Sequence, residues 1–199
     1  KTLTVKDLKT GEEKTDSFDK LVLTTGSWPI LPPIPGRELE NVQLCKNYNQ
    51  AKEIFAKKTD KKKVVVVGGG YIGIELVEAF ALEGKEVTLV DGLDRILNKY
   101  LDPEFTDILE EDLRERGVNV RLNEMVKSFE GENGVVNKVV TSGGEYEADM
   151  VILCVGFRPN NDLVKDQLET MPNGAIIVND YMETSVKDVY CKLLSLIHI

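Results

Sequence analysis

The sequence predicts an α/β protein that contains a Rossmann-like domain, built from a parallel sheet and an antiparallel meander. Three observations lead to this prediction. A valine-rich run, a glycine-rich turn and an apolar helix follow one another in VVVVGGGYIGIELVEAF, residues 64–80. Strand and helix patterns then alternate as far as residue 122. From residue 125 to 146 this alternation gives way to short runs separated by turn residues, which is typical of antiparallel strands.

The residues before the glycine-rich turn already read as folded β structure. Residues 1–17 predict two hairpin strands with a turn at Thr10-Gly11, and residues 20–24 predict a buried strand. The following stretch, WPILPPIPG, contains four prolines and predicts a stiff connector, because proline cannot donate to a β-ladder and restrains its neighbours. It is therefore a candidate domain boundary, and a short helix is expected after it at 50–58.

After the turn, each element carries its own signal. KEVTLVD, residues 85–91, predicts a strand that ends in an acid. The next helix is predicted over 102–117, with Asp102 as N-cap, Pro103 in the first turn and Gly117 at the C-terminal cap. Three further strands are predicted at 118–122, 149–156 and 174–180.

Composition excludes several classes of function. The balance of 42% hydrophobic and 30% charged residues is ordinary for a globular protein, and a net charge of −9 argues against a nucleic-acid partner. The three cysteines are widely spaced and lack a C-x-x-C pair, which favours a reducing, cytoplasmic setting and argues against a disulfide framework or a metal site. No apolar run reaches the roughly 18 residues of a membrane span, so no membrane partner is expected.

The spacing Gly68-x-Gly70-x-x-Gly73 predicts a dinucleotide site. The first glycine permits the tight turn, the second lets a pyrophosphate approach the backbone, and the third lets the helix pack closely on the strand. The N–H groups and partial positive charge of the helix N-terminus then face the phosphates. A glycine-rich turn that binds nothing is the alternative.

Asp91 ends the second strand at the distance expected for the residue that binds the adenine ribose. Its carboxylate would accept hydrogen bonds from the 2′-hydroxyl and repel a 2′-phosphate, which predicts NAD(H) rather than NADP(H). Arg95 lies close by in sequence; we expect it to face solvent or to pair with an acid, with a cofactor contact as the alternative.

Four blocks, taken in order, resemble the flavoprotein pyridine nucleotide–disulfide oxidoreductases: residues 18–36, 64–97, 100–113 and 152–190. Within that family the sequence is most similar to the group of NADH oxidases, NADH peroxidases and coenzyme A-disulfide reductases. TTGSWP and LCKN favour the water-forming NADH oxidases.

This resemblance implies a domain organisation. Residues 1–32 would end the first segment of an FAD-binding domain, 33–154 would form an inserted NAD(H)-binding domain, and 155–190 would return to the FAD-binding domain. CKLLSLIHI, residues 191–199, is unlike the family and reads as a non-native tail. The first FAD fingerprint and the redox-active cysteine would precede Lys1, so the sequence reads as a piece of a longer protein, and we expect it not to retain FAD by itself.

The resemblance also implies site residues. The NAD contacts would be Gly68, Gly70, Tyr71, Ile72, Gly73, Glu75, Asp91, Tyr100 and Gly156, and the FAD contacts Thr24, Thr25, Gly26, Ser27 and Lys46. The ring of Tyr71 would cover the flavin until NADH displaces it. Ordinary structural roles remain the alternatives for Tyr71, Glu75 and Lys46. Cys45 and Cys154 are not expected to be the catalytic cysteine.

The function implied is transfer of hydride from NADH to FAD and on to O2, giving water. Alternatives are an NADH peroxidase or a coenzyme A-disulfide reductase, and, from another class, a stand-alone NAD-binding module without catalysis. The resemblance also implies a homodimer or homotetramer, formed through a C-terminal domain that lies outside this sequence. No metal is implied.

Overall fold

The computed structural model describes residues 1–192, which fold as two compact units. Residues Pro29–Gly156 form the larger unit, and the smaller one contains Lys1–Trp28 together with the described residues from Phe157 onward. The larger unit is therefore inserted into the chain of the smaller one. It is an α/β structure with a parallel sheet and an antiparallel meander, so the predicted fold class is confirmed.

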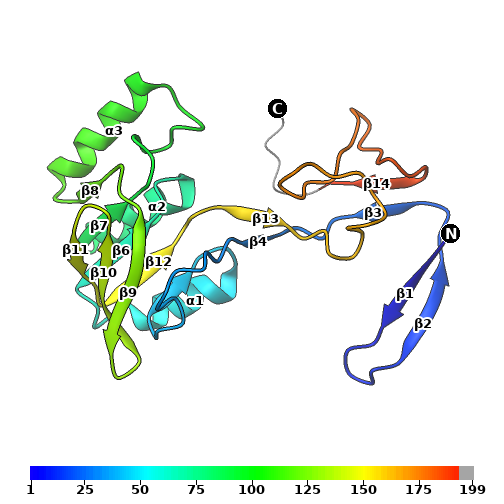
Figure 1. Ribbon diagram of the computed structural model, residues 1–199, viewed down its shortest axis with the longest axis horizontal. Coiled ribbons are helices and arrows are strands. Elements are labelled where there is room, and N and C mark those ends of the chain that lie inside the picture. The colour runs from blue at the N-terminus through cyan, green and yellow to red at the C-terminus, as the bar shows by residue number, and fades with distance from the viewer. Residues whose placement is uncertain (193–199) are drawn as a thin grey trace. The chain divides into compact units, whose positions relative to one another are not determined.

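Five parallel strands form the central sheet of the larger unit, in the order β5-β12-β6-β7-β8 (Figure 1). They are β5 (Val42–Leu44), β12 (Met150–Leu153), β6 (Lys63–Val67), β7 (Glu86–Val90) and β8 (Asn119–Arg121). Strands β6 and β12 are buried almost throughout. Their continuous apolar sequence is what a strand covered on both faces requires.

Three helices cover one face of this sheet: α1 (Tyr48–Lys57), α2 (Tyr71–Leu82) and α3 (Pro103–Glu115). Ile54, Val77 and Leu113, one from each helix, share a single apolar core with the strands. The Asn47 side chain caps α1 by accepting from the Gln50 amide at 3.0 Å. Asp102 occupies the N-cap of α3 without a side-chain bond, and Gly117, with φ +84°, follows its end, as predicted.

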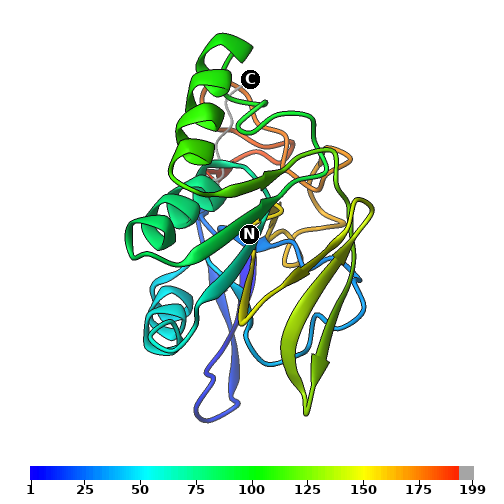
Figure 2. The ribbon, with the colours of Figure 1, turned by 90° about the vertical axis from the view of Figure 1, so that its left-hand side faces the viewer.

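The opposite face is covered by the meander of β9 (Val126–Glu132), β10 (Val135–Thr141) and β11 (Glu145–Glu147) (Figure 2). Phe129 and Val139 pack there against Val65 and Val151 of the parallel sheet. Asn133 and Gly134 both have positive φ, which a tight two-residue hairpin turn requires. The larger unit thus has three layers, and the parallel sheet is the middle one.

The smaller unit consists of short strand pairs around a small core. β1 (Thr2–Lys6) pairs with β2 (Glu13–Ser17), and β3 (Leu21–Leu23) pairs with β14 (Val189–Cys191). β4 (Ser27–Pro29) and β13 (Phe157–Pro159) pair where the chain passes between the units. Leu23, Leu168, Ile176 and Val189 are among the residues of the core.

Three expectations meet a different structure in this unit. Strand β3 is shorter than predicted and not buried throughout, because Val22 is 60% exposed. Residues 174–180 form no strand: Ile176 makes only an isolated bridge with Thr170, beyond the left-handed Gly174. Cys191, placed in the tail by the sequence, is buried in β14. The remainder of the predicted tail, residues 193–199, lies outside the described residues.

Candidate functional site

The candidate site lies where neighbouring parallel strands of the larger unit end. Gly68 follows β6, Asp91 follows β7, and Cys154 to Gly156 follow β12. Carboxyl ends of parallel strands meet at one edge of a sheet, and ligands of such sheets bind in the crevice outside that edge. The topology therefore brings together most of the residues that the sequence assigned to NAD.

The glycine-rich turn leaves no room for side chains at two positions. Gly68 has φ +107°, and a Cβ placed on it would lie 2.4 Å from the Cys154 carbonyl oxygen. A Cβ on Gly73 would lie 1.9 Å from the carbonyl oxygen of Gly68. The first and third glycines thus allow strand and helix to pack directly on each other, as the spacing predicts.

Gly70 is different, because its surroundings are open. It is the N-cap of α2, it makes no side-chain cap bond, and a Cβ on it would meet nothing within 4 Å. The first N–H groups of a helix lack intrahelical partners, and the first turn of α2 carries no acidic residue. This helix start fits a phosphate group, which would accept from those N–H groups.

The Asp91 carboxylate is fixed in place by backbone donors. Its Oδ2 accepts from the Gly69 amide in the glycine-rich turn, and its Oδ1 accepts from the Leu93 amide at 2.8 Å. An ionised carboxylate offers about four acceptor positions, so two remain for other donors. The carboxylate is therefore oriented beside the glycine-rich turn and keeps acceptor positions for other donors.

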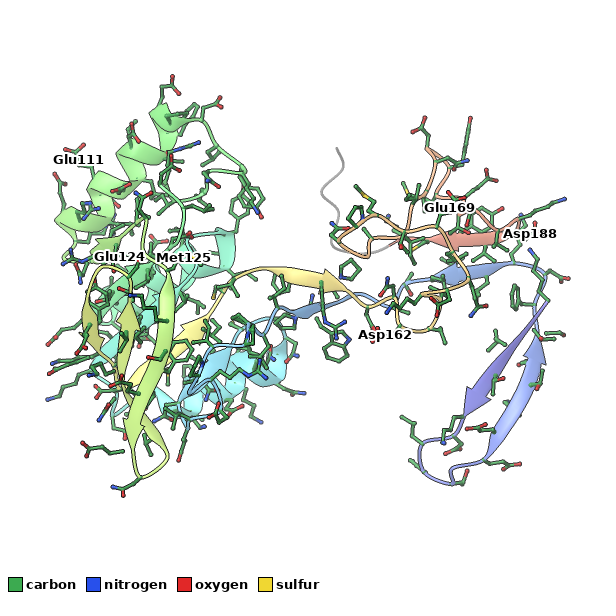
Figure 3. The ribbon with its side chains drawn as sticks, in the orientation of Figure 1. Glu111, Glu124, Met125, Asp162, Glu169 and Asp188 are labelled. Atoms are coloured by element: carbon green, nitrogen blue, oxygen red, sulfur yellow. The ribbon has the colours of Figure 1, made fainter. Side chains whose placement is uncertain are left out.

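The segment between β8 and β9, residues 122–125, lies next to Asp91, and we call it the wall. Two of its residues, Glu124 and Met125, are labelled in Figure 3. The Glu124 amide donates to the Asp91 carbonyl oxygen at 3.0 Å. A Cβ on Gly92 would lie 2.3 Å from the Met125 sulfur. The Glu124 carboxylate accepts from Thr141 Oγ1 and from the Tyr146 hydroxyl, so the meander holds this wall.

Arg95 does not behave as the sequence suggested. Its Nη1 donates to the Leu101 carbonyl oxygen at 2.7 Å and to Thr106 Oγ1 at 3.0 Å. Arg95 is half-buried, and no ion pair with an acid is found for it among residues 1–192. The guanidinium instead binds the segment that leads into α3 through its Nη1.

Two aromatic rings meet at the start of α2. The centroids of Tyr71 and Tyr100 lie 4.3 Å apart at an interplanar angle of 43°. Both rings remain accessible, with Tyr71 50% and Tyr100 44% exposed. Ile72 is half-buried and Glu75 is exposed on α2. The contact gives Tyr71 a partner within the larger unit and leaves one side of its ring open.

The residues assigned to FAD fall into both units. In the smaller unit, Thr25 Oγ1 donates to the Asn160 carbonyl oxygen at 2.6 Å, and the Asn160 amide donates to the Gly26 carbonyl oxygen at 2.9 Å. These bonds hold the Thr24–Ser27 turn against the chain that follows β13. Lys46 lies in the larger unit, exposed beside α1, where its amide donates to Gln50 Oε1. Gly156 ends the larger unit with φ +100°.

The cysteines lack the low pKa of a catalytic nucleophile. All three described cysteines are free thiols. Burial raises the pKa of Cys154 to about 12, and burial together with the charge of Glu75 raises the pKa of Cys45. Few thiolates are present at neutral pH under these conditions. No group of three or more potential metal ligands occurs in residues 1–192, and none of the helices described there is long and apolar enough to cross a membrane.

Residues 1–191 match the family of pyridine nucleotide-disulphide oxidoreductases. The chain belongs to this family. It is 64% identical over 191 residues to an NADH oxidase of Enterococcus faecalis, a match that covers 96% of this chain and 43% of the relative. An NAD(P)H sulfur oxidoreductase (CoA-dependent) of Pyrococcus furiosus is 43% identical over 183 residues, covering 90% of this chain and 41% of the relative.

Among solved structures, the water-forming NADH oxidase of Lactobacillus brevis bound to NADH superposes with a TM-score of 0.90 at 45% identity. That match covers 96% of this chain and 42% of the other. The chain thus spans less than half the length of these relatives. Membership in the oxidoreductase family agrees with the resemblance that the sequence motifs carry.

Sequence reasoning missed the contacts that orient the site in this family member. It did not predict the amides of Gly69 and Leu93 on Asp91, the wall at Met125, or Asn160 beside the Thr24–Ser27 turn. Only the contact between the Leu93 amide and Asp91 had a signal in the sequence, since an aspartate often accepts from the amide two residues later. The others join residues from separate strands and depend on the packing of the sheets.

Proposed function

We propose that this chain supplies the NADH-binding part of an FAD-dependent NADH oxidase. The observation that carries the proposal is the direct bond between the glycine-rich turn and Asp91 at the ends of β6 and β7. This arrangement would bring a pyrophosphate on the turn next to an acceptor for a ribose hydroxyl, which supports the proposal. The similarity to NADH oxidases over nearly the whole chain supports the same assignment.

The residues fit NAD(H) in a specific way. The pyrophosphate would lie at the open helix start of Gly70, the adenine ribose would bind the Asp91 carboxylate, and Ile72, Glu75 and Tyr100 would complete the site. Gly156 and Tyr71 would lie toward the nicotinamide. The Thr24–Ser27 turn and Lys46 would contact FAD. Bound nicotinamide and flavin supply the hydride and electron chemistry, while the chain binds and orients them.

The domain assignment follows from these sites. We infer that residues 33–154 form the NAD(H)-binding domain and that 1–32 and 155–190 belong to an FAD-binding domain, whereas the compact units divide at 28/29 and 156/157. The parent protein would pass electrons to O2, form water and assemble as a homodimer or homotetramer. Free cysteines suit the reducing cytoplasm, where we place it.

Two measurements test the proposed function. The chain itself should bind NADH in a fluorescence titration, and the absence of binding would contradict the nucleotide site. The full-length protein, purified with its flavin, should oxidise two NADH per O2 without accumulating peroxide. An equal ratio with peroxide released, or no oxygen uptake, would contradict the water-forming reaction and leave the nucleotide site standing.

An NADH peroxidase or a coenzyme A-disulfide reductase is the second candidate. The similarity to the Pyrococcus enzyme favours it, because that relative is CoA-dependent. Turnover with peroxide or with coenzyme A disulfide as acceptor would distinguish these activities. A non-catalytic NAD-binding module, the third candidate, would lack flavin absorbance in the full-length protein.

Replacing Tyr71 tests the aromatic residue at the helix start. Tyr71→Ala should change the NADH Michaelis constant and the rate of flavin reduction in the full-length protein. The lost aromatic pair is worth about 0.5–1.5 kcal/mol beyond the area it buries, and because Tyr71 is half-exposed the chain should stay folded. Tyr71→Phe keeps the ring and serves as the control. Unchanged kinetics with a large loss of stability would support a packing role instead.

A further inference from the structure

Two thiols lie side by side beneath the glycine-rich turn. Cys45 follows β5 and Cys154 follows β12, and these neighbouring parallel strands pair Leu44 with Leu153 in register. The paired register ends there, and the residues that follow it on the two strands are Cys45 and Cys154. Neighbouring strands lie about 4.8 Å apart, within the range of Cα separations that a disulfide accepts, about 4.4–6.8 Å.

The alternation of the strands places both side chains on the same face of the sheet. Val42, Leu44, Val151 and Leu153 pack in the core under the meander. Ile152 packs in the core under the helices, and both cysteines pack against that core. The two thiols thus project from adjacent strands in one direction, as cross-linking requires.

The position of the pair connects it to the nucleotide site. The Cys154 amide donates to the Val67 carbonyl oxygen at 2.7 Å, and the Cys154 carbonyl group lies against Gly68. A Cβ on Gly73 would lie 3.6 Å from the Cys154 Cβ. Both cysteines are partly rather than fully buried.

We propose that Cys45 and Cys154 form a thiol pair that hydrogen peroxide slowly closes to an intramolecular disulfide, which a thiol reductant reopens. A thiolate displaces hydroxide from hydrogen peroxide and becomes a sulfenic acid. The second thiol attacks that sulfur, forms the S–S bond and releases water. In total, two thiols and one peroxide give one disulfide and two waters, with sulfur oxidised and peroxide oxygen reduced.

The environment of the pair sets its speed and order of reaction. Burial raises the pKa of Cys154 to about 12, and Cys45 is raised by burial and by Glu75 on α2. Thiolates are therefore scarce at neutral pH, and closure should be slow compared with that of an exposed thiol of ordinary pKa. We assign the first oxidation to Cys45, because burial raises the pKa of Cys154 more strongly. Cys154 then attacks the sulfenic acid.

The test is a disulfide map of the chain after peroxide treatment. The folded chain is exposed to hydrogen peroxide, remaining thiols are alkylated, and non-reduced peptides are analysed by mass spectrometry. We expect a Cys45–Cys154 cross-linked peptide that dithiothreitol removes, with Cys191 mostly alkylated. Treatment in concentrated urea should scatter the pairing among the three cysteines, because only the folded sheet selects one pair.

Variants make the test decisive. Cys154→Ser should leave a sulfenic acid on Cys45 that a dimedone probe captures, and Cys45→Ser should abolish the cross-link; Cys191→Ala is the control that should retain it. Independent overoxidation of both thiols, or a cross-link equally frequent in urea, would overturn the proposal. The readout is covalent and does not require NADH to bind, so it is separate from the test of the proposed function.

Discussion

Gly68→Ala is expected to unfold the larger unit under conditions in which the unchanged chain is folded. An alanine at φ +107° carries backbone strain of about 1–3 kcal/mol. Its Cβ would also lie 2.4 Å from the Cys154 carbonyl oxygen, which is backbone of the adjacent buried strand and cannot rotate away. Overpacking of this kind costs about 1–3 kcal/mol more. The total is a large part of the 5–15 kcal/mol that usually stabilises a domain.

Urea unfolding of the chain, followed by far-UV circular dichroism, measures this effect. With a dependence of about 1–3 kcal/mol per molar urea, the midpoint should fall by on the order of 2 M. A midpoint for Gly68→Ala within error of the unchanged chain would contradict the tight turn in the structure.

Gly70→Ala is the matched control in the same turn. Gly70 has φ −79° and no atom lies within 4 Å of its Cβ position, so an alanine fits the fold. We expect a loss of stability of only about 1 kcal/mol, because alanine is a poorer N-cap than glycine but meets no steric conflict. The methyl group would nevertheless occupy the space through which a pyrophosphate approaches, so NADH affinity should fall at least about tenfold, or roughly 1.4 kcal/mol. The two glycines thus separate folding from binding.

Four of the five strands of the parallel sheet could be predicted because each carries a local signal, whereas β5 was not predicted. The valines of β6 and the strand that ends in Asp91 are bounded by glycines and charged residues, and a strand–helix alternation has few topologies available to it. The helix at 102–117 carried its own start and stop signals, and the structure places it at Pro103–Glu115.

The smaller unit could not be predicted to the same extent. Its strand β3 pairs with β14, which lies near the other end of the described chain, so neither strand contains a sign of its partner. GAIIVND has a strand-like composition, yet a strand also needs a neighbour with which to pair, and only one bridge forms there.

The position of the candidate site could be predicted from the sequence, whereas the orientation of its residues could not. Gly68, Gly70 and Asp91 follow from a spacing whose physical reason is local. The position of Met125 against Gly92 depends on how the meander packs on the sheet, and its sequence gave no sign of this contact. Arg95 illustrates the same limit, since its partners Leu101 and Thr106 belong to the approach to α3.

Asp91→Ala is expected to remove most of the preference for NADH over NADPH. In the unchanged chain, the carboxylate would accept a charge-assisted hydrogen bond from the ribose hydroxyl, worth about 1.5–3 kcal/mol. Against a 2′-phosphate, repulsion between like charges at about 4 Å reaches about 4 kcal/mol at an effective dielectric constant of 20. Together these favour NADH by a factor on the order of 10² or more. The preference should fall at least about tenfold in the variant.

The quantity to measure is the ratio of the two dissociation constants, because Asp91 also has a structural role. Its carboxylate accepts from the amides of Gly69 and Leu93. Its removal should therefore loosen the turn and weaken the binding of both NADH and NADPH. That loss largely cancels in the ratio, which isolates the interaction with the 2′ substituent. Asp91→Asn is the matched variant, since it keeps one oxygen acceptor and removes the charge.

The structure also sets how far the preference can shift. A phosphate in place of the hydroxyl needs a positive partner, and the nearby Arg95 is bonded to the Leu101 carbonyl oxygen and to Thr106. Loss of the Asp91 charge therefore relieves repulsion without supplying attraction. We expect both variants to bind NADPH more weakly than the unchanged chain binds NADH. A chain that prefers NADPH from the start, or a ratio unaffected by both substitutions, would show that Asp91 does not bind the ribose.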